Sequence, residues 1–187
     1  MVEGLQKPLT PALVTDLDGT LVAGNTFRIF IRDGLSRAPL ASKARICLWL
    51  LLRRLRLVSH ARMKFAILPL LGKPSRAFSE KIRSLRNPEV EALIARRRAE
   101  GWTILLATAA PEVYIKDIWD GPFVATEGCG PTECRGEEKV RRVEEYLRSH
   151  GACLAEAVSD HADDTPLLRK APSALLVCPD GSIRPFH

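Results

Sequence analysis

The sequence has no long hydrophobic run and no signal-peptide pattern. Its longest apolar run, ICLWLLL at residues 46–52, has seven residues, whereas a membrane-spanning helix needs about 20. The opening residues, MVEGLQKPLTPALV, lack an apolar stretch behind a basic start. These absences predict a protein that does not span a bilayer.

The five cysteines do not form a pattern typical of a zinc site. The nearest pair, Cys129 and Cys134, is not completed by a second pair or by histidines at a suitable spacing. We therefore interpret the cysteines as reduced thiols of a cytoplasmic protein and do not expect a structural zinc ion.

The net charge of +6 is unevenly divided along the 187 residues. Residues 25–91 contain 15 Lys and Arg against 4 Asp and Glu, a charge of +11, and the remainder contains 13 against 18, a charge of −5. This asymmetry indicates two parts with different tasks. Because aromatic residues make up only 6% and no nucleic-acid-binding motif is present, we do not expect a nucleic-acid partner.

Hydrophobic periodicity predicts two kinds of segment. In the basic part we predict only helices, at residues 26–36, 41–57, 59–71 and 75–86. Elsewhere strands alternate with helices, and the strands are expected at residues 12–17, 102–108, 122–127, 154–160 and 174–178. This alternation indicates a parallel sheet covered on both faces. We predict an α/β fold: a Rossmann-like core of about five strands (1–24 and 92–187), with a helical cap (25–91) inserted after the first strand.

Polar residues gather where the predicted strands end. The first strand leads into DLDGT, the second ends in a threonine, the fourth leads into SDHADD, and a lysine begins the helix before the fourth. The residues are Asp16, Asp18, Thr108, Lys139, Asp160, Asp163 and Asp164. Ligands of an open parallel sheet bind outside the carboxyl ends of its strands. We therefore expect these side chains to meet.

The residue types suit phosphate chemistry. Asp16 and Asp160, with a backbone carbonyl, offer the oxygen ligands that Mg²⁺ prefers. Lys139 and a hydroxyl suit phosphate oxygens, one carboxylate can attack phosphorus, and a second can move protons. Each segment alone has a simpler explanation as a turn, a helix cap or a solvated surface residue. Their joint occurrence in this order favours a site.

The motifs DLDGT, LLATAA, GEEK and SDHADDTP together resemble the four ordered motifs of the haloacid dehalogenase superfamily. The helical insertion after the first motif is similar to the branch that includes phosphoserine phosphatase. The resemblance implies that Asp16 is the nucleophile that takes the phosphoryl group. It also implies that Asp18 is the general acid and base, as in the phosphatases of the superfamily.

The resemblance implies further roles. Thr108 and Lys139 would bind phosphate, and Asp164 would be the outer carboxylate, with Asp163 as the alternative. Mg²⁺ would be held by Asp16, the carbonyl of Asp18 and Asp160, and substrate would also contact Gly19, Thr20, Asn25 and Ala109. The expected activity is Mg²⁺-dependent hydrolysis of a small-molecule phosphate monoester.

Two departures bear on the substrate. Phosphoserine phosphatases have a glutamate where this chain has Asn25, and two glycines where it has Ala109 and Ala110. Phosphoserine is therefore not favoured as the substrate.

One alternative function is a catalytically weak scaffold of the same fold that binds a phosphorylated ligand or partner through its basic cap. A response-regulator receiver is disfavoured because the third strand, ATEG, ends without an aspartate.

The stretch CLWLLLRRLRL in the basic part allows two interpretations. Trp49 and the leucines could form the core of the cap, with the arginines in solvent. Alternatively, Arg53, Arg54 and Arg56 could gather an anionic substrate while the apolar face holds its organic part or rests on a membrane surface.

Overall fold

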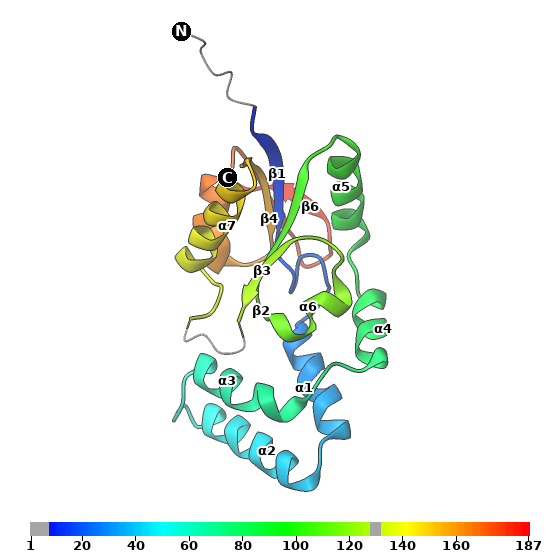
Figure 1. Cartoon of the computed structure of the whole chain (residues 1–187), viewed down its shortest axis with the longest axis vertical. Helices are drawn as coiled ribbons and strands as arrows, with labels where there is room; N and C mark the ends of the chain where they lie inside the picture. Colours follow the sequence, from blue (N-terminus) through cyan, green and yellow to red (C-terminus); the bar gives the residue numbers. More distant parts are fainter. Residues whose placement is uncertain (1–7, 128–131) are drawn as a thin grey trace.

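A six-stranded sheet lies at the centre of the computed structural model, which describes residues 8–127 and 132–187 (Figure 1). The strands are β1 (Thr10–Thr15), β2 (Thr103–Pro111), β3 (Phe123–Thr126), β4 (Ala152–Ser159), β5 (Ser173–Val177) and β6 (Ile183–Pro185). Their order is β3-β2-β1-β4-β5-β6, with β6 antiparallel to β5 and all other pairs parallel. The predicted α/β fold with a parallel sheet is confirmed, with one strand more than expected.

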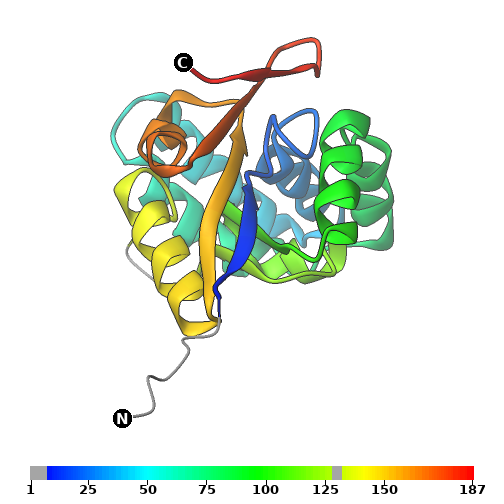
Figure 2. The same ribbon diagram turned by 90° about the horizontal axis from the view of Figure 1, so that it is seen from above.

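Helices cover both faces of the sheet (Figure 2). They are α5 (Pro88–Ala99) and α6 (Glu112–Ile118) on one face, and α7 (Glu137–Ser149) and α8 (Thr165–Lys170) on the other. Alternate residues of β1 serve the two faces, because Leu13 packs in one core while Ala12 and Val14 pack in the other. A short 3₁₀ helix, Ala162–Asp164, precedes α8.

Between β1 and α5 the chain forms four helices, after a loop at residues 16–25. This stretch contains α1 (Thr26–Arg37), α2 (Leu40–Arg54), α3 (His60–Leu71) and α4 (Arg76–Ser84), and we call α1–α4 the helical segment. Asn25, Ser59 and Ser75 each begin a helix, because their side-chain oxygens accept the backbone N–H three residues ahead. The four predicted helices are therefore present, with small differences at their ends.

Aromatic rings join the helical segment to the sheet region. Phe30 of α1, Phe78 of α4 and Tyr114 of α6 form a cluster whose ring centroids lie 5.0–5.5 Å apart. All three side chains are buried. In contrast, α2 packs mainly against α3 and lies at the end of the molecule away from the sheet (Figure 1).

Some boundaries differ from the sequence-based expectation. β2 continues to Pro111 instead of ending at Thr108, with an irregularity in its pairing to β3. The expected cap boundary at residue 91 falls within α5, and the division into two domains stays a prediction.

Cys129 lies outside the described residues, and the other four cysteines are free thiols. Within the described residues, no helix has the length and apolarity needed to cross a membrane.

Candidate active site

Asp16 follows the last residue of β1, at the carboxyl end of a central strand. Its backbone N–H donates to the carbonyl of Val158 in β4, 3.0 Å away, so the neighbouring strand fixes its position. Asp16 is 8% exposed and lines a pocket of about 400 Å³. The carboxylate therefore lies at the sheet edge where the sequence places it.

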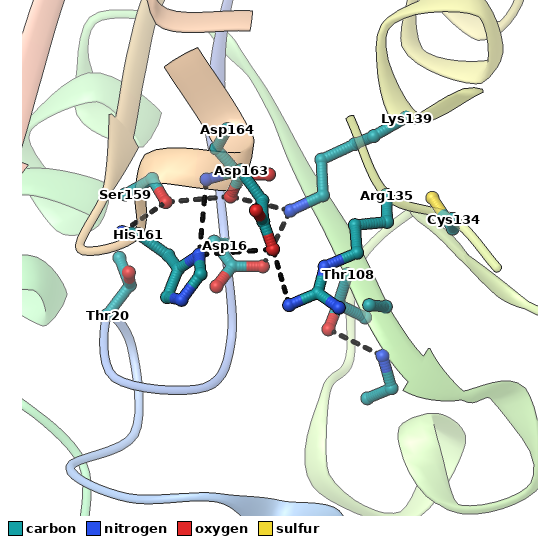
Figure 3. Close-up of polar contacts among 12 residues, drawn as sticks. Asp16, Thr20, Thr108, Cys134, Arg135, Lys139, Ser159, His161, Asp163 and Asp164 are labelled. Atoms are coloured by element: carbon teal, nitrogen blue, oxygen red, sulfur yellow. Dashed lines mark hydrogen bonds and ion pairs between the residues drawn. The ribbon is translucent and has the colours of Figure 1, made fainter. Parts of the chain in front are cut away.

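Lys139 forms a buried link between two carboxylates (Figure 3). It comes from the first turn of α7, and its Nζ donates to Oδ1 of Asp16 at 2.9 Å and to Oδ2 of Asp164 at 2.7 Å. The hydroxyl of Ser159, the last residue of β4, donates to the same Asp164 oxygen at 2.7 Å. The structure thus brings together side chains from three distant parts of the chain.

Burial and neighbouring charges set the protonation of these groups. Burial raises the pKa of Asp16 to about 7, with the Lys139 cation opposing the shift and the carboxylates of Asp164 and Asp18 adding to it. Burial alone would lower the pKa of Lys139, but Asp16 and Asp164 outweigh it and raise that pKa. Lys139 is therefore a cation at neutral pH, and further positive charge in the pocket would favour ionised Asp16.

Asp18 is held by the start of α1. Its Oδ1 accepts the backbone N–H of Thr26 at 2.7 Å, and the Thr26 hydroxyl lies 2.9 Å from the hydroxyl of Tyr114. Burial raises the pKa of Asp18, although hydrogen bonds from Thr26 and the charge of Lys64 oppose the shift. A carboxyl group with a raised pKa can hold a proton in the pocket and release it, as general acid–base catalysis requires.

Thr20 and Gly19 both determine the position of Asp160. The Thr20 hydroxyl donates to Oδ1 of Asp160 at 3.1 Å and accepts the Asp160 N–H at 2.9 Å. Gly19 has a φ of +80°, and a Cβ there would fall 2.0 Å from Oδ2 of Asp160. Glycine is therefore required for this close approach. Gly19 lines the pocket and Thr20 is buried, and their contact with substrate stays a prediction.

Thr108 and the residues after it form another wall of the pocket. Thr108 is 1% exposed, and its Oγ1 accepts the N–H of Ala110 at 3.0 Å. The carbonyl of Ala109 accepts hydrogen bonds from Lys64 Nζ and from the Thr126 hydroxyl, both at 2.9 Å. This wall is therefore fixed by α3 and β3 as well as by β2.

The two neighbouring aspartates of the SDHADD stretch have different surroundings. The Asp164 side chain is 4% exposed and pairs with Lys139. The Asp163 side chain is 40% exposed and pairs with Arg135 and with Nδ1 of His161, which is 3.2 Å away. The geometry favours Asp164 as the carboxylate that supports the site, with Asp163 at the rim.

The helical segment contributes side chains that the sequence did not indicate. Phe27, His60 and Lys64 line the pocket, together with Glu133 from the loop after β3. Lys64 is 3% exposed, donates to Glu133 and lies with its Nζ 5.4 Å from the centre of the Phe27 ring. Burial would raise the pKa of Glu133, but hydrogen bonds from His60 and Lys64 outweigh it and lower that pKa to about 2.

Asn25 was predicted to bind substrate and does line the pocket. Its side-chain oxygen accepts the backbone N–H of Arg28 at 2.9 Å, as the cap of α1. Asn25 therefore has a structural partner already. Its contact with substrate stays a prediction.

The donor set fits a hard divalent cation. Among residues 8–127 and 132–187, no group of three or more His, Cys, Asp or Glu side chains is arranged to hold a metal ion. The predicted set differs from such a group because its third ligand is the backbone carbonyl of Asp18. Lys139 takes Oδ1 of Asp16 and Thr20 takes Oδ1 of Asp160, hydrogen bonds that leave Oδ2 of each carboxylate for another ligand. Oxygen donors of this kind suit Mg²⁺ with several waters retained.

Comparison with known families gives a match over most of the chain. A model described as haloacid dehalogenase-like hydrolase matches residues 13–169, which include all four predicted motifs. Among curated proteins, no sequence matches this chain.

Several solved structures share the fold. A protein with unknown function from Bordetella pertussis Tohama I has a TM-score of 0.68 at 20% identity, with 89% of each chain covered. A probable phosphoserine phosphatase from Vibrio cholerae has a TM-score of 0.59 at 14% identity, covering 88% of this chain and 55% of that one. A phosphoserine phosphatase from T. onnurineus has a TM-score of 0.51 at 17% identity. The match covers 91% of this chain and 86% of that one. At these identities the likeness shows the fold.

Proposed function

Because this chain belongs to the haloacid dehalogenase-like hydrolase family, we propose that it hydrolyses a small phosphate monoester through a phosphoryl group carried on Asp16. Family and fold support phosphatase activity. The observation that carries the proposal is the buried Asp16 carboxylate at the end of β1, held at 2.9 Å by Lys139 inside the pocket.

In the first step an oxygen of Asp16 attacks phosphorus while the bond from phosphorus to the ester oxygen breaks. Lys139 binds the other oxygen of Asp16 and favours its ionised form. Asp18, whose pKa is raised, gives its proton to the departing ester oxygen. The products of this step are the free alcohol and a phosphoryl group on Asp16.

In the second step water attacks phosphorus, and the bond between phosphorus and Asp16 breaks. Asp18, now ionised, takes a proton from that water, so each cycle returns both aspartates to their starting forms. The Thr108 hydroxyl and the Lys139 ammonium are the groups that we assign to the phosphate oxygens.

Mg²⁺ is the cofactor that we assign to the reaction. Asp16, the backbone carbonyl of Asp18 and Asp160 would hold it, and Thr20 and Gly19 keep Asp160 in position for this role. When bound, the ion supplies positive charge that offsets the phosphate and the neighbouring carboxylates.

We propose that the helical segment acts as a cap over the pocket. It supplies Phe27, whose ring offers an apolar surface for the organic part of the ester, Lys64, whose charge offsets that of Glu133, and His60, whose Nδ1 lies 3.5 Å from Oε1 of Glu133. Asn25 is uncharged and caps α1, so it does not replace the glutamate of phosphoserine phosphatases. We therefore assign a phosphate monoester without specifying an amino-acid substrate.

Turnover of p-nitrophenyl phosphate with Mg²⁺ tests the mechanism. Asp16→Asn should abolish turnover, because an amide does not attack phosphorus. Asp163→Asn is a matched control, since this carboxylate lines the same pocket but is 40% exposed and is held by Arg135. We expect the control to retain most of the activity.

Asp18→Asn separates the two steps. p-Nitrophenolate leaves without a proton, so this variant should release about one equivalent of it per enzyme and then slow by about 10²–10⁴-fold. Intact-protein mass spectrometry should find the phosphoryl group retained on Asp16.

Two outcomes would contradict the proposal. Undiminished turnover by Asp16→Asn protein would exclude Asp16 as the nucleophile. Phosphate binding without turnover of any ester by the unmodified protein would instead support the catalytically weak scaffold.

A further inference from the structure

The outward side of α2 is apolar. Leu40, Leu48, Leu51 and Leu55 are 83%, 54%, 51% and 58% exposed. With the exposed Ala44 and Cys47 they occupy positions 40, 44, 47, 48, 51 and 55, which lie along one side of the helix and of the residue that follows it. We call these six residues the α2 face.

The opposite side of α2 meets the rest of the molecule. Ile46 is the buried residue of α2, and Trp49 and Leu50 are partly buried against the same core. The leucines of the α2 face are therefore not needed for the packing of α2 on α3. Single exposed leucines are common on proteins, but a continuous stripe of them indicates an interaction surface.

Cations border the α2 face. Arg45 and Arg54 are exposed, and at 100° per residue Arg45 lies on one flank of the stripe and Arg54 on the other, whereas the exposed Arg53 lies on the side of Ile46. The sequence has no Asp or Glu from residue 34 to residue 79. The positive charge around the α2 face is therefore not offset by acidic residues within residues 34–79.

We propose that the α2 face docks on an anionic lipid surface. Its leucines would enter the boundary between headgroups and acyl chains, and the flanking arginines would meet lipid phosphates. The positive charge beside the α2 face favours an anionic lipid surface over a second copy of this chain as the partner. Two α2 faces packed together would bring their arginines close without acidic residues to neutralise them.

The docking surface is separate from the pocket. None of the three arginines expected to gather substrate, Arg53, Arg54 and Arg56, lines the pocket. The structure therefore does not support their direct contact with a bound substrate. Changes on α2 should leave turnover of p-nitrophenyl phosphate unaltered, so the docking proposal and the catalytic proposal fail independently.

Co-sedimentation of the full chain with vesicles tests the charge requirement. The protein should bind vesicles of mixed phosphatidylcholine and phosphatidylglycerol and not those of phosphatidylcholine alone. The double variant Arg45→Gln, Arg54→Gln should bind about 25-fold more weakly, from about fivefold for each arginine near an anionic surface. The matched control is Arg76→Gln, because Arg76 is 93% exposed on α4 and lies outside α2.

A second pair of variants tests the apolar requirement. The double variant Leu51→Gln, Leu55→Gln should bind vesicles about tenfold more weakly or worse. It lacks the two leucine side chains whose transfer from water into the lipid boundary is favourable. Leu9→Gln is the control, since Leu9 is 58% exposed, as Leu55 is, and lies before β1. Circular dichroism and turnover should be the same for all variants, which confirms that they are folded.

Several outcomes would overturn the proposal. Absence of vesicle binding at low salt would do so, as would equal binding to both kinds of vesicle or binding that the arginine variants do not alter. A dimer in light scattering that the leucine variants dissociate, without vesicle binding, would assign the α2 face to a second copy. Loss of binding near 1 M salt, where the Debye length is about 3 Å, would support the proposal.

Discussion

The sheet region and the helical segment each place one buried lysine at the pocket, and the two lysines hold different partners. Lys139 lies between Asp16 and Asp164, whose side chains are 11% and 4% exposed. Lys64 joins α3 to the Ala109 carbonyl and to Glu133. The first arrangement fixes the carboxylate that we propose as the nucleophile, and the second fixes a wall of the pocket. We therefore expect Lys139 to affect the chemical step and Lys64 to affect the shape of the pocket.

The largest difference should appear when Lys139 is removed. Lys139→Met leaves two buried carboxylates without their cation, so we expect kcat to fall by about 10²–10³-fold. Breaking a buried ion pair also destabilises the fold, by about 3–5 kcal/mol. Turnover and urea unfolding would measure the two effects. Equal losses in Lys139→Met and Lys64→Met would remove the distinction between the two lysines.

Within the sheet region, the acidic residues after β4 should differ from one another. Asp160→Ala should weaken the apparent affinity for Mg²⁺ most, because Asp160 is the expected ligand. Asp164→Ala should have a comparable or smaller effect, in the range of about 10–100-fold that is typical of groups behind the ligands. Asp163→Ala should have the least. Titration of activity against Mg²⁺ would rank them, and Asp163→Ala as the most damaged variant would contradict the assignment.

In the helical segment, loss of Lys64 should act on substrate binding rather than on the chemical step. Lys64→Met removes one hydrogen bond from Glu133 and one from the Ala109 carbonyl, so we expect KM to rise about tenfold while kcat changes little. Lys73→Met, which changes an exposed lysine between α3 and α4, is the control. A fall in kcat with unchanged KM would place Lys64 with Lys139 in the chemistry.

The smallest expected effect concerns acid stability. The pKa of Glu133 in the folded protein is about 2, below its usual 4.5. Ionised Glu133 therefore stabilises the fold above pH 4.5, and this contribution is lost as the pH falls from 4.5 towards 2. The Tm difference between the unmodified protein and Glu133→Gln should close over that range. Glu145→Gln, at a side chain that is 66% exposed, is the control. A difference that persists to pH 2 would contradict the assignment.

The sheet and its polar edge could be predicted from the sequence because local patterns determine them. Apolar runs mark the parallel strands, and the parallel arrangement brings their carboxyl ends together. Asp16, Lys139 and Asp164 therefore meet as expected. β6 could not be predicted, because Ile183–Pro185 is too short to show periodicity and ends in proline.

Contacts that depend on tertiary structure had no sequence signal. Lys64 is one of many cations in a basic segment, and its partner Glu133 lies 69 residues away in a loop. The α2 face illustrates another limit. Periodicity shows that Leu48, Leu51 and Leu55 share a side of the helix, but only the packing on α3 shows that this side faces outward.

The hydrogen bond from the first backbone N–H of α1 to Asp18 would affect the timing of the cycle that we propose. The Thr26 hydrogen bonds oppose the rise that burial causes in the pKa of Asp18, so binding of α1 and ionisation of Asp18 favour each other by thermodynamic linkage. After Asp18 has given up its proton, its negative charge would hold α1 more firmly against the pocket. When Asp18 takes a proton from water, that attraction weakens. The helical segment, which we propose to act as a cap, would then be freest to move when phosphate is ready to leave.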